Sequence, residues 1–179
     1  MKFPWLSASC GGGITRDILL GLTPPAALVN PLYLIIATLT SLIIFFLAAK
    51  KLFSSSKKIY EIIMLLTDSI GLGIFTVCGI KIAFDAGFGE NLFLIVFVAV
   101  ITGVGGGVLR DIFAGQKPYI FVKHVYACAA IAGAVVCAVL YQISGEEISM
   151  LSGFAIIIAI RLCAAKCRWS LPKANDFEI

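Results

Sequence analysis

Long apolar stretches with very few charges constrain this chain more than any other feature of its sequence. Several of them run near twenty residues, the length that an α-helix needs to cross the hydrocarbon core of a bilayer. The chain has 179 residues, of which 60% are hydrophobic and 13% are charged. That charged share is about half the share in a soluble globular protein. We therefore predict an all-α fold, that of a polytopic helical membrane protein.

Six apolar segments follow one another along the chain, one short and five fuller. The short connections between them carry turn-forming residues such as Gly, Pro and Ser, which interrupt regular structure. The predicted spans are a glycine-interrupted segment from Pro4 to Leu20, followed by Pro31–Ala49, Ile59–Phe84, Asn91–Gly115, Val122–Tyr141 and Ile148–Ala164.

The charges between the spans predict their direction across the membrane. Basic residues fill alternate connections and acidic residues fill the others. Because cytoplasmic loops are enriched in Lys and Arg, the basic side and the C-terminus are expected in the cytoplasm. The basic residues are Lys50, Lys51, Lys57, Lys58, Lys117, Lys123, Lys166, Arg168 and Lys173, and the acidic ones are Asp85, Glu90, Glu146 and Glu147.

A glycine-rich motif occurs twice in the chain. The segment Gly11–Pro24 aligns with Gly105–Pro118, and both copies contain Gly-Gly-Gly-x-x-Arg-Asp followed by an Ile, a Gly and a Pro. Each copy is then followed by a tyrosine, Tyr33 or Tyr126, and another span. A charged dipeptide is rarely repeated in register by chance, so the pattern indicates a duplication. The loop charges give the copies opposite directions, which predicts inverted repeats related by a pseudo-twofold axis in the membrane plane.

The duplication divides a single membrane domain into parts. We predict residues 1–49 as a first, incomplete glycine-motif repeat, 57–143 as a second three-helix repeat, 147–165 as a final transmembrane helix and 166–179 as a cytoplasmic tail. A full span precedes the second copy, whereas only a short segment precedes Gly11. Two explanations stay open. Either the chain has lost its first helix through truncation or a misplaced start, which we favour, or the first repeat is genuinely incomplete.

Two roles are open for the glycine triplets. Three consecutive glycines weaken a helix and let carbonyls turn away from their partners, which is tolerated at membrane depth only beside protein or a watery cavity. Two such breaks facing each other could present oxygens to a cation. Alternatively, the small residues let helices pack closely. The candidate pathway residues are Gly11, Gly12, Gly13, Gly105, Gly106 and Gly107, with Ser9 and Thr102 as further oxygen donors.

The Arg-Asp pair of each motif is a candidate for a charged pathway or for gating. Arg16-Asp17 and Arg110-Asp111 lie about one helical turn beyond the glycines. Neighbouring residues on a helix do not face each other. We therefore expect each Arg to pair across the repeat interface or with a carbonyl, or else to extend to the membrane surface.

Two further charged residues lie inside the span Ile59–Phe84. Asp68 is the deeper of the two. Because a charge far inside the bilayer implies partners, we expect Asp68 either to attract cations or to join two helices. Lys81 lies nearer the acidic side and could simply extend to that surface.

Other chemistries lack the residues that they need. The glycines fit neither a Walker A sequence nor a dinucleotide-binding motif, and His124, the one histidine, leaves little for nucleophilic catalysis. The cysteines form no C-x-x-C pair, and Cys163 and Cys167 supply only two thiols. The basic residues lie at span ends, which argues against a nucleic-acid partner. We expect no enzyme, no metal and no cofactor.

The motifs together resemble a known family. Gly-Gly-Gly-x-x-Arg-Asp used twice, with Asp68-Ser-Ile-Gly-Leu-Gly-Ile-Phe75 and Gly79-Ile-Lys81 in the second repeat, is similar to the bacterial branch of the trimeric intracellular cation (TRIC) channels. That family is also catalogued as a glycine transporter domain. The resemblance covers nearly the whole chain.

The resemblance implies a bacterial inner-membrane homotrimer of seven-helix protomers, each with its own pore for monovalent cations, chiefly potassium. Its glycine-kinked second and fifth helices would carry Gly11–Gly13 and Gly105–Gly107, and Ile148–Ala164 would be the unrepeated seventh helix. The sequence departs from the family in the first helix, whose Asp-x-x-Gly-Leu motif should mirror Asp68–Leu72. That departure puts conduction in doubt.

Three functions are therefore compared. The first is a monovalent cation channel, favoured by the paired glycine triplets and the resemblance. The second is a secondary transporter for a small amino acid such as glycine, which inverted repeats suit equally well. The third is a truncated, non-conducting membrane protein in which the glycines only pack helices.

Overall fold

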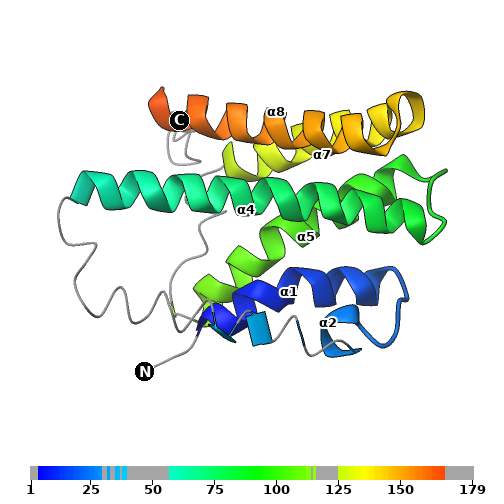
Figure 1. Ribbon diagram of the computed structural model, residues 1–179, viewed down its shortest axis with the longest axis horizontal. Coiled ribbons are helices and arrows are strands. Elements are labelled where there is room, and N and C mark those ends of the chain that lie inside the picture. Colours follow the sequence, from blue (N-terminus) through cyan, green and yellow to red (C-terminus); the bar gives the residue numbers. More distant parts are fainter. Residues whose placement is uncertain are drawn as a thin grey trace, which may run out of the picture.

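The computed structural model describes residues 4–29, 32, 35, 36, 38, 39, 57–113, 115 and 125–167, and for residues 4–10, 57–61, 63, 64 and 110 it describes the backbone alone. All regular elements in these residues are helices, which confirms the all-α prediction. They are α1 (Pro4–Leu19), α2 (Ala26–Val29), α4 (Lys57–Asp85), α5 (Leu92–Phe113), α7 (Val125–Ser144) and α8 (Glu146–Lys166), drawn in Figure 1.

Five of the predicted spans are confirmed as helices whose ends differ from the prediction by a few residues. Within the described residues, α4, α5, α7 and α8 each contain a stretch long and apolar enough to cross a membrane, in α4 from Leu65 to Asp85. The predicted span Pro31–Ala49 lies outside the described residues, apart from five helical positions. These are Leu32, Ile35, Ile36, Thr38 and Leu39.

Helix α5 is the centre of the arrangement (Figure 1). It packs against α1 on one side and against α4 and α7 on the other, while α8 lies along α7 and α4. Helix α1 therefore joins the other helices mainly through α5. The two motif-bearing helices, α1 and α5, run in opposite directions, as inverted copies of one motif would. The pseudo-twofold axis itself stays a prediction.

A single residue, Gly145, separates α7 from α8. Its φ of 83° lies in the left-handed region that glycine adopts most readily, and the chain reverses there so that α8 returns along α7. Glu146 and Glu147 occupy the first turn of α8 and Lys166 its last turn. These charges complement the partial charges at the two helix ends.

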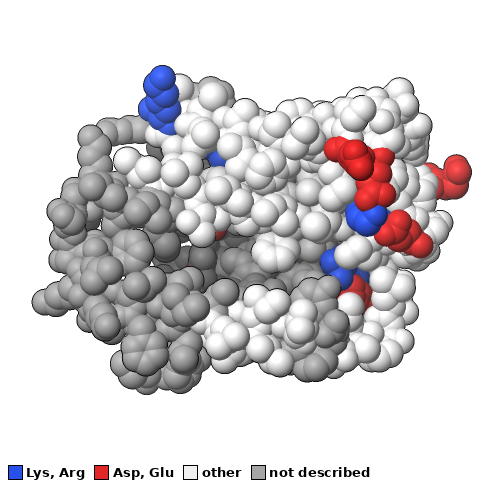
Figure 2. All heavy atoms as spheres, viewed as in Figure 1, with Lys and Arg blue, Asp and Glu red and all other residues white. Residues whose placement is uncertain are grey.

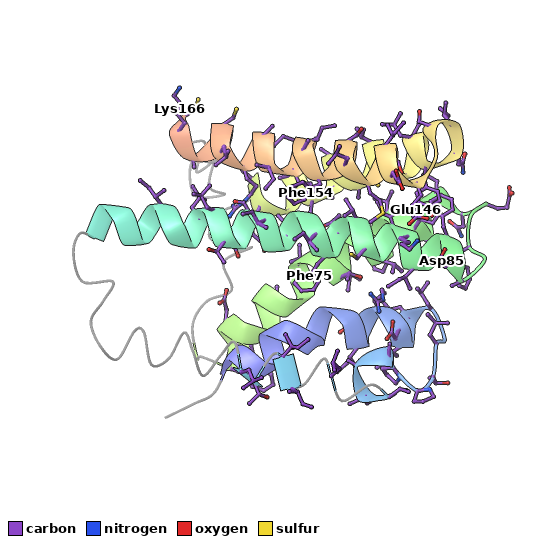
Figure 3. The ribbon with its side chains drawn as sticks, in the orientation of Figure 1. Phe75, Asp85, Glu146, Phe154 and Lys166 are labelled. Carbon is purple, nitrogen blue, oxygen red and sulfur yellow. The ribbon has the colours of Figure 1, made fainter. Side chains whose placement is uncertain are left out.

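The acidic connections lie at one end of the helices, and the last turn of α8 with Lys166 lies at the other. Acidic side chains gather at one end of the molecule in Figure 2, where Figure 3 places Asp85 and Glu146. Lys166 lies at the other end. This arrangement agrees with the alternation of acidic and basic connections from which the orientation was predicted.

Helices α4 and α5 approach each other through two reciprocal glycine–threonine contacts. A methyl group added at Gly79 would lie 3.0 Å from Thr102 Oγ1, and one added at Gly103 would overlap Thr76 Oγ1. Each threonine hydroxyl donates to the carbonyl four residues earlier in its own helix, at 2.7 Å in both cases. The hydroxyls are thus satisfied within their helices, and the glycine opposite each one leaves the room that it occupies.

Helices α7 and α8 meet at a pair of glycines. A methyl group added at Gly133 would lie 2.9 Å from the carbonyl oxygen of Gly153, and one added at Gly153 would lie 3.0 Å from the carbonyl oxygen of Gly133. Lipid tails are as apolar as the side chains, so association in a bilayer depends on close packing at such small residues. Glycine contacts therefore hold both the α4–α5 and the α7–α8 pairs together.

The glycine that follows the Arg-Asp pair ends the helix in both motif copies. Gly21 has φ 71° and Gly115 has φ 69°. Their N–H groups donate to the carbonyls of Ile18 at 3.1 Å and Ile112 at 3.0 Å. A left-handed glycine is a common helix C-terminus. The duplication is thus visible in the local backbone as well as in the sequence.

We expect Gly103→Ala to destabilise the protein by about 1–3 kcal/mol, the usual cost of forcing an extra methyl group into a packed interface. Adding Thr76→Ala removes the hydroxyl that the new methyl group overlaps, so the double variant should be more stable than Gly103→Ala alone. Thermal unfolding of the purified variants in one detergent measures both effects. Equal stability of the single and double variants would contradict the proposed contact.

Candidate functional site

The two glycine triplets meet where α1 crosses α5. A methyl group added at Gly12 would overlap the carbonyl oxygen of Thr102 and lie 3.4 Å from the backbone nitrogen of Gly106. One added at Gly105 would lie 3.3 Å from Gly12 Cα. The two backbones are therefore in direct contact, and the packing role proposed for the triplets is confirmed at Gly12 and Gly105.

The third glycine of each triplet has more room. Apart from the backbone of its own helix, the nearest described atom to a methyl group added at Gly13 is Nη2 of Arg16, at 4.0 Å. For Gly107 it is the hydroxyl oxygen of Tyr126, at 3.7 Å. These two glycines occupy the same position in the two motif copies. Each triplet thus has a packed face and a more open face, and the open face is bordered by a polar side chain in both copies.

Both triplets lie within continuous helix, so the prediction of helix breaks is wrong. Helix α1 runs unbroken through Gly11–Gly13 and α5 runs unbroken through Gly105–Gly107. A glycine in a helix interior costs about 1 kcal/mol relative to alanine, and the close packing of α1 on α5 offsets this cost. The carbonyl of Gly11 also accepts a hydrogen bond from the Thr15 hydroxyl at 2.9 Å. The triplets therefore shape the site through the absence of side chains.

The expectation that Arg16 pairs across the repeat interface or with a carbonyl is wrong. Its Nη2 lies 2.6 Å from Asp17 Oδ1, and its Nε donates to the same oxygen at 2.8 Å. The Cβ atoms of neighbours do diverge on a helix, but the long arginine side chain curls back at the end of α1. The other oxygen of Asp17 accepts the N–H of Ala26 at 2.9 Å. The pair thus ties the end of α1 to the start of α2.

The remaining candidates of the two motifs are placed as follows. Thr102 is buried, and its side chain faces Gly79 of α4, so its role as an oxygen donor in a pathway stays a prediction. Asp111 is buried near the end of α5. The side chains of Ser9 and Arg110 lie outside the described atoms.

Asp68 pairs with an arginine from the last helix. Arg161 Nη2 lies 2.7 Å from Asp68 Oδ2, and Arg161 Nε donates to the hydroxyl of Ser69 at 3.2 Å. Arg161 is only 4% exposed. Of the two roles left open for Asp68, the joining of two helices is confirmed, because this ion pair connects α4 to α8.

A tyrosine completes this cluster. The guanidinium carbon of Arg161 lies 4.7 Å from the centroid of the Tyr126 ring, a distance at which a cation is attracted to an aromatic face. Tyr126 is buried on α7, and Leu72, Val104 and Ile157 belong to the same apolar cluster. Helices α4, α7 and α8 thus meet around one buried positive charge.

Arg161 is not one of the candidate site residues that the sequence motifs predict. Its signal was present, because it is the one charged residue between Glu147 and Lys166 in α8. It lies within the predicted final span Ile148–Ala164, and a charge inside a membrane helix implies a specific partner. Asp68, one of the predicted candidates, is that partner.

Lys81 lies at the acidic end of the molecule, as expected. Its ammonium group bonds to the carboxylate of Glu146 and lies 3.9 Å from Asp85 Oδ2. The other oxygen of Glu146 accepts a hydrogen bond from the Tyr141 hydroxyl at 3.3 Å. The charged groups are between 37% and 58% exposed, so the network joins α4, α7 and α8 where they reach solvent and adds little stability.

Membrane-length helices, an antiparallel crossing of two glycine triplets and a buried ion pair define a polytopic α-helical membrane protein built on a repeated motif. The glycine transporter family model matches residues 6–49 and 65–142. The chain belongs to this family.

Relatives and solved structures are similar to the chain over most of its length. The inner membrane protein YadS of Escherichia coli, a UPF0126 protein, is 33% identical over 90% of this chain and 76% of its own. A structure solved to explain conductance through TRIC cation channels has a TM-score of 0.80 and 36% identity, covering 94% of this chain and 79% of that one. The TRIC channel orthologue from Rhodobacter sphaeroides has a TM-score of 0.80 and 27% identity, covering 91% and 80%.

We expect Arg161→Met to destabilise the protein far more than the double variant Asp68→Asn/Arg161→Met. Removing one partner of a buried ion pair typically costs about 3–5 kcal/mol, because the other charge is left uncompensated, whereas replacing both by neutral groups is often tolerated. Thermal unfolding in detergent compares the two. A double variant as unstable as the single one would argue against the pairing.

Proposed function

We propose that this protein forms a passage for monovalent cations along the open faces of its glycine triplets, where Gly13 and Gly107 lie. The observation that carries the proposal is the antiparallel crossing, in which Gly12 and Gly105 pack against the opposite backbone. Among the described atoms outside the backbone of its own helix, a methyl group added at Gly13 or Gly107 would meet only one polar side-chain atom, at 4.0 or 3.7 Å. On this face the two glycines carry no side chain of their own, and polar groups of Arg16 and Tyr126 border them. Oxygen groups lining a narrow passage can replace the hydration of an ion that crosses the bilayer.

Similar proteins of known structure also support a cation channel. The solved structures that match this chain are of TRIC cation channels, at a TM-score of 0.80. Their similarity covers more than nine-tenths of this chain. Fold alone does not fix a function, and the proposal therefore also depends on the geometry at Gly13 and Gly107.

We infer potassium as the main permeant ion, a homotrimer as the assembly and a bacterial inner membrane as the location. The Rhodobacter sphaeroides relative is described as a trimeric channel, and the Escherichia coli relative is named an inner membrane protein. The charge asymmetry of the connections supports a cytoplasmic C-terminus.

A secondary transporter for a small amino acid is the competing function, and the description of the matching family model as a glycine transporter favours it. The two functions differ in kinetics. A channel gives unitary currents, whereas a transporter gives saturable uptake of its substrate without them.

The purified protein in planar bilayers should show unitary potassium currents. Gly13→Ala and Gly107→Ala should lower the potassium flux several-fold while the protein still folds, because each new methyl group fits without overlap but occupies the open face. Potassium efflux from proteoliposomes and unfolding in detergent measure the two properties separately.

Gly12→Ala is the matched control for packing. Its methyl group would overlap the carbonyl oxygen of Thr102, so this variant should lose stability by about 1–3 kcal/mol. Unchanged flux in both Gly13→Ala and Gly107→Ala would contradict the proposed pathway. Saturable glycine uptake without unitary currents would instead favour the transporter.

The orientation can be tested with reporter fusions. A fluorescent protein that matures only in the cytoplasm should be bright when fused after Ile179, and alkaline phosphatase fused there should be inactive. The same two reporters inserted after Glu90 should give the opposite result, because that connection lies at the acidic end of the helices. The reverse pattern would overturn the predicted topology.

A further inference from the structure

We propose that the Tyr126 hydroxyl borders the cation pathway at Gly107, and that Arg161 and Asp68 are positioning residues that hold the tyrosine there. This inference rests on the proposed function, since it assigns a role to one residue beside that pathway. Tyr126 would be the side-chain oxygen that a permeating ion meets on the α5 half of the crossing.

The position of the hydroxyl is the first observation. Oη of Tyr126 is 3.7 Å from the point where a Cβ atom of residue 107 would lie. Apart from the neighbouring backbone of α5 itself, it is the one described group within 4 Å of that point, so it borders the more open face of the second triplet directly. A phenol oxygen has lone pairs with which it can accept a hydrogen bond or face a cation.

The fixed orientation of the ring is the second observation. Tyr126 is only 5% exposed, and it shares an apolar cluster with Leu72, Val104, Ala130 and Ile157. These side chains come from four different helices, so the ring is enclosed on several sides. A phenol enclosed in this way keeps its hydroxyl in one place, which a selective site requires.

The buried charge is the third observation. Arg161 lies over the ring at 4.7 Å, and its own position is fixed by Asp68 at 2.7 Å and Ser69 at 3.2 Å. An arginine alone near a cation pathway would repel the permeating ion. The carboxylate of Asp68 offsets that charge, so the cluster can hold the ring without an uncompensated positive charge beside the pathway.

The two motif copies differ at this point. The open face of Gly13 is bordered by the guanidinium of Arg16, paired with Asp17, whereas that of Gly107 is bordered by a phenol. Equivalent backbone positions therefore carry different polar groups. On this proposal the oxygen at Tyr126 contributes to the choice of ion, and the paired charge at Arg16 does not.

The decisive variant is Tyr126→Phe. It keeps the ring and its contact with Arg161 and removes only the oxygen, so folding should be retained. In planar bilayers we expect a several-fold fall in unitary potassium conductance and a changed permeability of potassium relative to sodium. Tyr141→Phe is the matched control on the same helix, because Tyr141 stacks on Phe84 at the acidic end. This variant should leave the conductance and the permeability ratio unchanged.

The positioning role of the ion pair is tested by combining its variant with Tyr126→Phe. Asp68→Asn/Arg161→Met should also lower conductance, but it should have no further effect when added to Tyr126→Phe, because the pair acts through the hydroxyl. Such non-additivity distinguishes positioning from a general loss of stability. Independent, additive effects would overturn the positioning role.

The outcomes separate this inference from the proposed function. A conducting wild-type protein whose conductance and ion preference are unchanged in Tyr126→Phe overturns the inference and leaves the channel standing. A wild-type protein that passes no cation overturns both. A fall in conductance confined to Tyr126→Phe and the ion-pair variant supports the inference.

Discussion

Backbone contact at glycine is the interaction on which the rest of this structure depends. In a bilayer the surrounding medium is as apolar as the side chains, so helices gain little from hiding apolar surface and associate through close packing instead. The described helices meet in this way at three places, α1 with α5 at Gly12 and Gly105, α4 with α5 at Gly79 and Gly103, and α7 with α8 at Gly133 and Gly153. Because α5 takes part in two of these contacts, its position follows from them.

The buried cluster of Asp68, Arg161 and Tyr126 fixes how the packed helices are aligned along their length. Glycine contacts bring helices close but allow them to slide along each other. A short ion pair between two helices fixes their relative height. The desolvation of Arg161 is unfavourable, and three partners from two other helices offset it. Through Tyr126 the cluster also reaches the α5 triplet, so the last helix is connected to the central crossing.

The crossing itself joins the two roles that three glycines in a row could have. The lack of side chains at Gly12 and Gly105 lets α1 and α5 touch, and the third glycine of each triplet lies on an adjoining face beside a polar side chain. Helical periodicity explains the division, since successive residues lie about 100° apart on the helix and cannot all face the same neighbour. A single duplicated motif can therefore both build the crossing and shape the proposed passage beside it.

The sequence by itself determined the membrane class, most helix positions, the opposed directions of the two motif copies and the acidic end, because each follows from local hydropathy or charge. Only the tertiary structure decided that the triplets stay helical, that Arg16 curls back onto Asp17, and that Asp68 meets Arg161. These outcomes depend on contacts between residues far apart in the chain, or on side-chain paths that spacing along a helix does not fix. Arg161 shows the limit most clearly: its charge was visible in the sequence, but its partners on α4 and α7 were not.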